Sequence, residues 1–501
     1  MLSKPPRIFI DIPDHTIGVV PGQRMPFSLH ILDAQPQKAC VAIMISDPLG
    51  RSRQHISDEF SIDSSDHVHP MLWEQVRRGQ PGTYRLQVEL FLPETNQRFV
   101  VSRHLEMVIP GHLVPGVLRP VERVGPVCCP FPFPDPDTDA LEAAFELAHE
   151  EVQALANGNG SYGKGYEMLV PNEDEPAAET RENPLVRTTA SIAMGYMLAG
   201  EVWGNEEYTG FARAALNYLL SHDQHESGAF LYWGMGEEER LNDQDNFYCT
   251  GYGALPFVMA HEMLQCPRAL DVLKRAGDWT LDKPLTGNVN YDLFAMWFLP
   301  QLYRLTGDEK YLDSAIWRTE GAAFDGQNPG GAWPGHNLSH GYHAIILLGM
   351  ASLYRELPDD HPFRSRLHTR LVMAAHFGAA MFSEEGSSYY GWEYNRRGFH
   401  VDWEGRPAGK KTIPYGAWCA AWQVLDDCLE LDDHIASGLC HAMCRAHQRY
   451  LDGTDKHWGM YTRDKTGYRG WSNMPVASTL WGIGCLLSWL NKKGKCDRQD
   501  D

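Results

Sequence analysis

One stretch of the sequence predicts most of the architecture: Asn288-Val-Asn-Tyr-Asp292-Leu-Phe-Ala-Met-Trp-Phe-Leu-Pro-Gln-Leu-Tyr-Arg-Leu-Thr-Gly-Asp-Glu-Lys-Tyr-Leu312. Residues 293–299 are apolar without interruption, which predicts a helix over 289–306 that is buried on most of its surface. Gly307 suits a left-handed helix end, and Asp308 can cap the helix that follows. Asp292 stands at the start of the first helix, where the helix dipole favours a carboxylate. It is therefore either a capping partner or a catalytic acid.

The composition bounds the class of protein. The chain has 501 residues, 43% of them hydrophobic, which fits a globular protein with room for two domains. A formal net charge of -21 with no basic block disfavours nucleic acid and anionic membranes as partners. The 11 cysteines are scattered, and we expect them to be mostly reduced and buried. The N-terminus has no apolar signal region and no later run is long enough to span a bilayer, so we expect a cytoplasmic protein unless an export signal was removed.

Residues 1–110 predict a β-sandwich domain. Short runs such as Arg7-Ile-Phe-Ile and Thr83-Tyr-Arg-Leu-Gln-Val alternate apolar and polar residues, and turn residues separate them. Residues 111–136 are rich in proline, as in Pro130-Phe-Pro-Phe-Pro, and predict a linker without helices.

Residues 137–495 predict twelve helices arranged as six hairpins. Their connections alternate between short turns and long loops rich in glycine, aromatic and charged residues. This alternation describes an (α/α)6 toroid with one plain rim and one elaborated rim. Because long ordered loops in a compact domain are usually functional, we expect the site at the elaborated rim.

The long loops also indicate the kind of ligand. Aromatic residues are interleaved there with Asn, Asp, His and Arg. Aromatic rings stack on the apolar faces of pyranose sugars, while polar side chains bind the hydroxyls. We therefore expect a carbohydrate. The aromatic candidates for substrate binding are Trp333, Trp392, Trp471 and Tyr252.

The segment Tyr291-Asp292-Leu-Phe-Ala-Met-Trp-Phe-Leu-Pro-Gln-Leu-Tyr-Arg-Leu-Thr-Gly-Asp-Glu-Lys-Tyr-Leu resembles the inner-helix motif of the unsaturated glucuronyl and rhamnogalacturonyl hydrolases. The resemblance implies an (α/α)6 toroid in which Asp292 serves as general acid. It also implies that residues 333–343 line the pocket. Asn290 and Tyr291 depart from the family pattern, and so does the additional β-sandwich. These departures favour a related toroid family, such as β-glucuronidase-type exo-hydrolases.

Hydrolysis of a glycoside usually needs a second carboxyl group across the scissile bond. The candidates for this partner of Asp292 are Asp243, Asp245 and Glu393, with Asp402 and Glu404 as further loop carboxylates. For Asp243 and Asp245 the alternative role is capping of the helix near residue 247. Hydration of an unsaturated uronate would need one acid only.

Histidines and arginines supply the remaining polar candidates. His336, His340 and His343 fall on one helical face and could hold Zn²⁺, but no fourth ligand is adjacent, so we assign them to the substrate and expect neither metal nor cofactor. An anionic sugar needs a cationic clamp, preferably arginine. The candidates for the clamp are Arg396, Arg397 and Arg469.

These features favour an exo-acting glycoside hydrolase that removes a terminal uronic acid from acidic oligosaccharides. A polysaccharide lyase on the same scaffold is the alternative, with Tyr342 and either His340 or His343 carrying out β-elimination. A non-catalytic sugar-binding protein and a sugar epimerase are two further alternatives. The sequence leaves the oligomeric state open, including a homo-oligomer.

Overall fold

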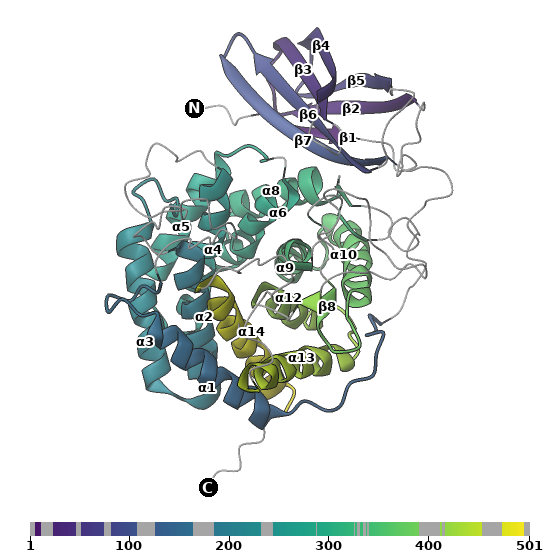
Figure 1. The fold of residues 1–501 in the computed structure, drawn as a ribbon. Coiled ribbons are helices and arrows are strands. Elements are labelled where there is room, and N and C mark those ends of the chain that lie inside the picture. Colours follow the sequence, from purple (N-terminus) through teal and green to yellow (C-terminus); the bar gives the residue numbers. More distant parts are fainter. Residues whose placement is uncertain are drawn as a thin grey trace, which may run out of the picture.

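The structure is a computed structural model, and it describes residues 6–11, 24–46, 52–74, 82–107, 126–163, 185–231, 244–286, 288–324, 326–327, 331–333, 337, 340–389, 411–412, 416–452 and 473–494. Two parts are visible in Figure 1, a small β-structure and a larger ring of helices. The strands of the β-structure lie between Arg7 and Met107 and the ring helices between Thr138 and Lys492. A separate two-stranded pair, β8 (Ser388–Tyr389) and β9 (Lys411–Thr412), lies between the helices of the ring in sequence.

The N-terminal part is an antiparallel β-sandwich, as predicted. One sheet has the order β1-β2-β5 and the other β4-β3-β6-β7. Residues alternate between the core and the surface along β3, where Val41, Ile43 and Ile45 are buried, because successive side chains of a strand point to opposite faces. The strands are β1 (Arg7–Asp11), β2 (Arg24–Leu32), β3 (Gln37–Ser46), β4 (Ser52–Ile62), β5 (Asp66–Glu74), β6 (Gly82–Leu92) and β7 (Gln97–Met107).

The C-terminal part is an (α/α)6 toroid, also as predicted. The inner helices contact one another in sequence, and α14 packs on α2 to close the ring (Figure 1). The inner members are α2 (Val186–Trp203), α4 (Gln244–Met263), α6 (Val289–Phe294) continued by α7 (Leu299–Thr306), α9 (His340–Glu356), α12 (Gly416–Asp426) and α14 (Asn473–Lys492). The outer members are α1 (Thr138–Ala154), α3 (Glu206–Tyr218), α5 (Ala269–Leu281), α8 (Glu309–Arg318), α10 (Phe363–Ala380) and α13 (His434–Leu451).

The helix predicted over 289–306 is interrupted. A 3-10 turn over Ala295–Trp297 separates α6 from α7. Pro300 lies at the start of α7 and has no N–H to continue the ladder, which accounts for the break. The end of α7 is as predicted, because Gly307 has a left-handed conformation with φ 68°. The start of the next helix is also as predicted, because the side chain of Asp308 accepts a hydrogen bond from the Lys310 amide.

Two of the long connections begin with the same sequence pattern and the same glutamine contacts. Gln224-His-Glu-Ser-Gly228-Ala-Phe230 and Gln327-Asn-Pro-Gly-Gly331-Ala-Trp333 share the positions of Gln, Gly, Ala and the aromatic residue. Each glutamine Nε2 donates to the glycine carbonyl and to a carbonyl of the next outer helix, that of Val272 or Arg370. This repeat places Phe230 and Trp333 in equivalent buried positions.

The two glycines are required where these connections pack closely against the next outer helix. Gly228 and Gly331 have φ of 100° and 89°, which L side chains rarely adopt. A Cβ on either would overlap the carbonyl oxygen of Arg275 or Met373 on the next outer helix. These contacts therefore join the start of each connection to the next outer helix.

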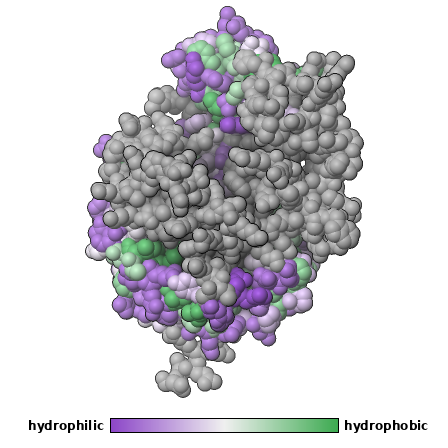
Figure 2. Space-filling view, viewed as in Figure 1, coloured by the Kyte–Doolittle hydropathy of each residue, from purple (hydrophilic) through white to green (hydrophobic). Residues whose placement is uncertain are grey.

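The sandwich touches the toroid through β1. Strand β1 contacts the π-helical turn Thr319–Phe324 that follows α8, where Gly321 lies beside Phe9. In the space-filling view, the described surface around the lower edge of the toroid is mainly hydrophilic (Figure 2). Among the described helices, none combines the length and apolar character needed to cross a bilayer.

Candidate functional site

The candidate site lies where the inner helices begin. The described turns between α2 and α3, α4 and α5, and α7 and α8 are short, so the inner helices all start at the opposite, elaborated rim. Unsatisfied amides and helix dipoles make a helix N-terminus favourable for negative charge. A ring of such N-termini around one axis favours an anionic ligand.

An aromatic cluster forms the floor beneath this rim. The rings of Tyr252 and Trp297 have centroids 4.9 Å apart, and Trp297 lies 6.0 Å from Trp481. Tyr248 and Phe294 complete the cluster. These side chains come from the inner helices α4, α6 and α14 and the 3-10 turn, so the axis of the toroid is filled at this depth. Any ligand must bind above the cluster, at the first turns of the helices.

Asp292 is held inside the protein rather than at this opening. The residue has no exposed surface, and its Oδ1 lies 3.3 Å from Nη1 of Arg318, which is also fully buried. The Thr286 amide donates to both carboxylate oxygens at 3.0 and 3.2 Å, and the Thr286 hydroxyl donates to Oδ2 at 3.1 Å. Thus α6 is tied to the outer helix α8 and to the α5–α6 connection.

Arg318 completes this buried unit. Its Nη2 donates to the carbonyls of Thr280 and Lys283 at 2.9 and 2.6 Å, and its guanidinium lies over the Phe247 ring at 4.6 Å. Burial lowers the pKa of Arg318 to about 10, and the charge of Asp292 opposes this shift. The guanidinium therefore stays charged at neutral pH.

These contacts correct the role predicted for Asp292. A general acid must reach the glycosidic oxygen and exchange protons with it. Asp292 accepts hydrogen bonds on both oxygens and is shielded from solvent, so it cannot do this without breaking the ion pair with Arg318. We assign it to the structure of the rim.

Trp333 and His343 also differ from their predicted roles. The Trp333 indole is fully buried and donates to the Ala323 carbonyl at 2.8 Å, so it offers no ring face for sugar stacking. His343 is fully buried, its Nε2 donates to the Ala374 carbonyl at 3.0 Å, and its ring lies 5.1 Å from that of Trp333. Both side chains pack between the two rings of helices, which excludes them from substrate contact in this structure.

His340 and Tyr252 are buried at the base of the rim. His340 lies at the start of α9 with its ring 5.6 Å from that of Trp418. Burial lowers the pKa of His340 to about 3 and that of His343 to about 4, so both are neutral at physiological pH. Among the described residues, no group of three or more His, Cys, Asp or Glu is arranged to hold a metal ion. Contact of His340 or Tyr252 with substrate stays a prediction.

The remaining predicted residues fall mostly outside the described part of the chain. Helix α4 begins at Gln244, three residues earlier than predicted, so Asp245 belongs to its first turn, although its side chain is not among those described. The other candidates that lie outside the described residues are Asp243, His336, Trp392, Glu393, Arg396, Arg397, Arg469 and Trp471. Their roles stay predictions.

Two polar residues at the elaborated rim were not predicted as site residues from the sequence. Arg187 lies half-buried in the first turn of the inner helix α2, which supplies a cation outside the loops where a clamp was expected. Asp223 ends the π-helical turn Leu219–Asp223 and is fully buried, and its carboxylate has no hydrogen-bond partner within the described part of the chain. Burial raises the pKa of Asp223 well above its usual value. An acidic residue with a perturbed pKa is a candidate functional residue, and its burial can be found only from the structure.

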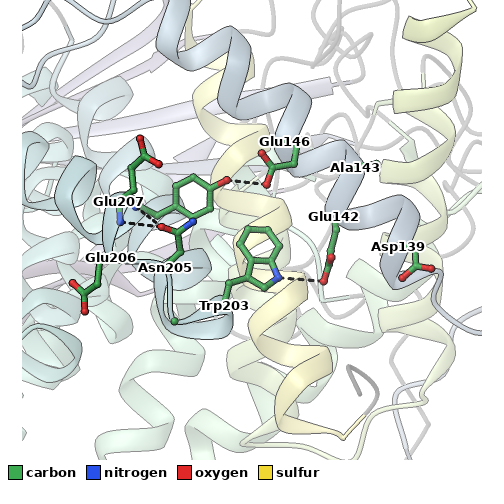
Figure 3. Close-up of a pocket in the computed structure, with 10 residues that line it drawn as sticks. Asp139, Glu142, Ala143, Glu146, Trp203, Asn205, Glu206 and Glu207 are labelled. Atoms are coloured by element: carbon green, nitrogen blue, oxygen red, sulfur yellow. Dashed lines mark hydrogen bonds between the residues drawn. The ribbon is translucent and has the colours of Figure 1, made fainter. Parts of the chain in front are cut away.

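A cavity of about 790 Å³ lies among the described residues at the plain rim, which is the rim opposite the candidate site. Figure 3 shows Glu142 and Glu146 of α1 on one side, directed toward Trp203 at the end of α2 and Asn205 in the α2–α3 turn. Glu206 and Glu207 lie at the start of α3. Trp203 donates to Glu142 at 3.1 Å and Tyr208 to Glu146 at 2.8 Å. No Lys or Arg of the described residues lines this cavity, so its charge is unfavourable for an acidic sugar.

No family model matches the sequence, and no curated protein is significantly similar to it. The structure is similar to a family 76 glycoside hydrolase from a bovine Bacteroides thetaiotaomicron strain, at 13% identity over 94% of this chain and 98% of that one, with a TM-score of 0.45. An unsaturated glucuronyl hydrolase from Streptococcus agalactiae is similar at 13% identity over 74% and 97% of the two chains, with a TM-score of 0.45. A polysaccharide lyase is similar at 9% identity over 96% of this chain and 64% of its own, also with a TM-score of 0.45.

At identities of 9 to 13% and TM-scores of 0.45, these similarities transfer neither a reaction nor a substrate to this chain.

Proposed function

We propose that this protein is a glycoside hydrolase that removes a terminal uronic acid, either β-glucuronyl or unsaturated uronyl, from acidic oligosaccharides. The observation that carries the proposal is the closed helical ring whose inner helices all begin at one elaborated rim. Their N-termini favour a carboxylate on the substrate. Arg187 in the first turn of α2 adds a cation, and the loop arginines Arg396, Arg397 and Arg469 remain candidates for a bidentate clamp.

Asp245 takes the place of Asp292 as the leading catalytic carboxylate. It belongs to the first turn of the inner helix α4, where the helix dipole stabilises the ionised form. An ionised carboxylate suits a general base that activates water, or a nucleophile. Asp243 or Glu393 would then be the proton donor. No metal or cofactor is part of the proposal.

A direct test compares activity among three variants. Wild type is assayed with p-nitrophenyl β-glucuronide and with an unsaturated uronyl disaccharide, beside Asp245→Asn, Asp292→Asn and the control Glu206→Gln at the plain rim. We expect Asp245→Asn to lose at least about 10²-fold in kcat with an unchanged melting temperature. The control should retain full activity. An Asp245→Asn enzyme of wild-type activity would refute the assignment, and no release of uronic acid from either substrate would refute the function.

A polysaccharide lyase is the second candidate function. The hydrolase hypothesis relied on Asp292 as its acid, whereas the lyase hypothesis did not, so the burial of Asp292 counts against the hydrolase more. His343 is no longer available to it, which leaves Tyr342 with His340, both on α9. A lyase introduces a double bond and raises ultraviolet absorbance on an acidic polysaccharide. Hydrolysis of an unsaturated substrate lowers that absorbance.

A further inference from the structure

Two cysteines lie one turn apart on the outer helix α13. The Sγ atoms of Cys440 and Cys444 are 4.0 Å from each other, and each is 3.8 Å from the carbonyl oxygen of Asp137. Cys440 is fully buried, whereas Cys444 is partly exposed. Both thiols are reduced in the structure. The pair therefore combines a thiol that a small reagent can reach with a sheltered thiol beside it.

We propose that Cys440 and Cys444 form a reversible redox modification site, which a peroxide converts to an intrahelical disulfide. This inference does not rest on the proposed function. Cys444 reacts first, because it is the accessible member of the pair. Its thiolate attacks one peroxide oxygen, the O–O bond breaks, and a sulfenic acid forms. The Cys440 sulfur then attacks the Cys444 sulfur and displaces water. In total, two thiols and one hydrogen peroxide give one disulfide and two waters.

The local chemistry supports this order. The hydrogen bond between the two sulfur atoms, in which either can be the donor, lowers the pKa of Cys444. The thiolate is the form that reacts with peroxides, and redox-sensitive cysteines often stand next to a resolving thiol. By contrast, burial raises the pKa of Cys485 and Cys419, which have no route to a reagent.

Oxidation would act on the closure of the outer ring. Asp137 caps the start of α1, where its Oδ1 accepts a hydrogen bond from the Ala140 amide at 2.9 Å, and α1 packs on α13. Positions i and i+4 of a helix have Cβ atoms about 5–6 Å apart. A disulfide requires about 3.5–4.5 Å. Forming the bond therefore tightens one turn of α13 along the helix axis and changes its contact with Asp137.

The test treats the full-length reduced protein with hydrogen peroxide and maps its thiols by peptide mass spectrometry. We expect a Cys440–Cys444 linkage that dithiothreitol reverses, together with a lower melting temperature for the oxidised form. In Cys440→Ser, Cys444 should stop at sulfenic acid and higher oxides. In Cys444→Ser, Cys440 should remain a thiol.

Cys128 serves as the control for exposure, since it is exposed and its Sγ lies 3.4 Å from the carbonyl oxygen of Pro126, with Cys129 as its neighbour in sequence. Cys128→Ser should leave the Cys440–Cys444 linkage and its effect on melting unchanged. The proposal is overturned if Cys440 and Cys444 both remain thiols while Cys128 is oxidised, or if Cys444 pairs with a different cysteine.

Discussion

Asp292 and Arg318 form an ion pair in which the two side chains are 1% and 0% exposed, at an Nη1–Oδ1 distance of 3.3 Å. The pair joins the first turn of an inner helix to the last residue of an outer one. Burying two charges is costly, and the cost is offset here by hydrogen bonds from Thr286 and to the carbonyls of Thr280 and Lys283. Removal of either partner would leave a charge without compensation.

The first prediction concerns this pair. Asp292→Ala should lower the free energy of unfolding by about 3–5 kcal/mol, because it leaves the Arg318 charge buried and unpaired. Urea denaturation measures this change. The exposed pair Arg366–Glu320 is the control, and Glu320→Gln should cost less than about 1 kcal/mol. If Asp292→Asn has wild-type stability and yet no activity, Asp292 is catalytic after all.

The second prediction concerns the buried histidines. The pKa of His343 is about 4 in the folded protein, against about 6.5 in the unfolded chain. Between these values the unfolded chain binds more protons, so stability is lost as the pH falls from 6.5 toward 4. His343→Gln retains an N–H that can donate to the Ala374 carbonyl. Wild type should lose about 2 kcal/mol of its free energy of unfolding between pH 7 and pH 5 through His343, and the variant should not show this loss. Urea unfolding at both pH values tests this, and an unchanged difference would contradict it.

The third prediction concerns Asp223. Its pKa is raised by burial, so the folded state favours the protonated acid and stability falls as the pH rises above about 4. Asp223→Asn cannot ionise. The variant should therefore match wild type near pH 4 and exceed it by more than about 1 kcal/mol at pH 8. Thermal melting from pH 4 to pH 8 would measure this growing difference in stability. A variant that is less stable at pH 8 would show that the carboxylate is needed in its charged form.

The fourth prediction concerns Gly331, which packs against the next outer helix. Gly331→Ala should cost roughly 2 kcal/mol or more, because it combines a strained positive φ with an overlap against the Met373 carbonyl. Gly307→Ala is matched to it, since Gly307 also has a positive φ but a Cβ there would meet no other atom within 4 Å. It should cost only about 1 kcal/mol. Equal losses of stability in the two variants would show that Gly331 is not in close contact with α10.

Much of the fold could be predicted because its signals are local. The apolar run at 293–299, the stop at Gly307 and the cap at Asp308 define helices through neighbouring residues only, and the alternation along β3 does the same for a strand. The Gln-x-x-x-Gly-Ala-aromatic repeat at 224–230 and 327–333 was also present in the sequence. It would have indicated that Trp333, like Phe230, is buried.

Hydrogen bonds and capping within single segments set the order of the helices and ends such as the stop at Gly307, so these features could be predicted from the chain alone, together with the alternation of short and long connections. The direction of the Asp292 side chain depends instead on tertiary contacts. Its helix is apolar all round, so periodicity does not indicate which side faces the axis, and contacts with residues outside the helix decide it. Those neighbours, Thr286 and Arg318, turn the carboxylate between the two rings, and that contact changes a predicted acid into a structural residue.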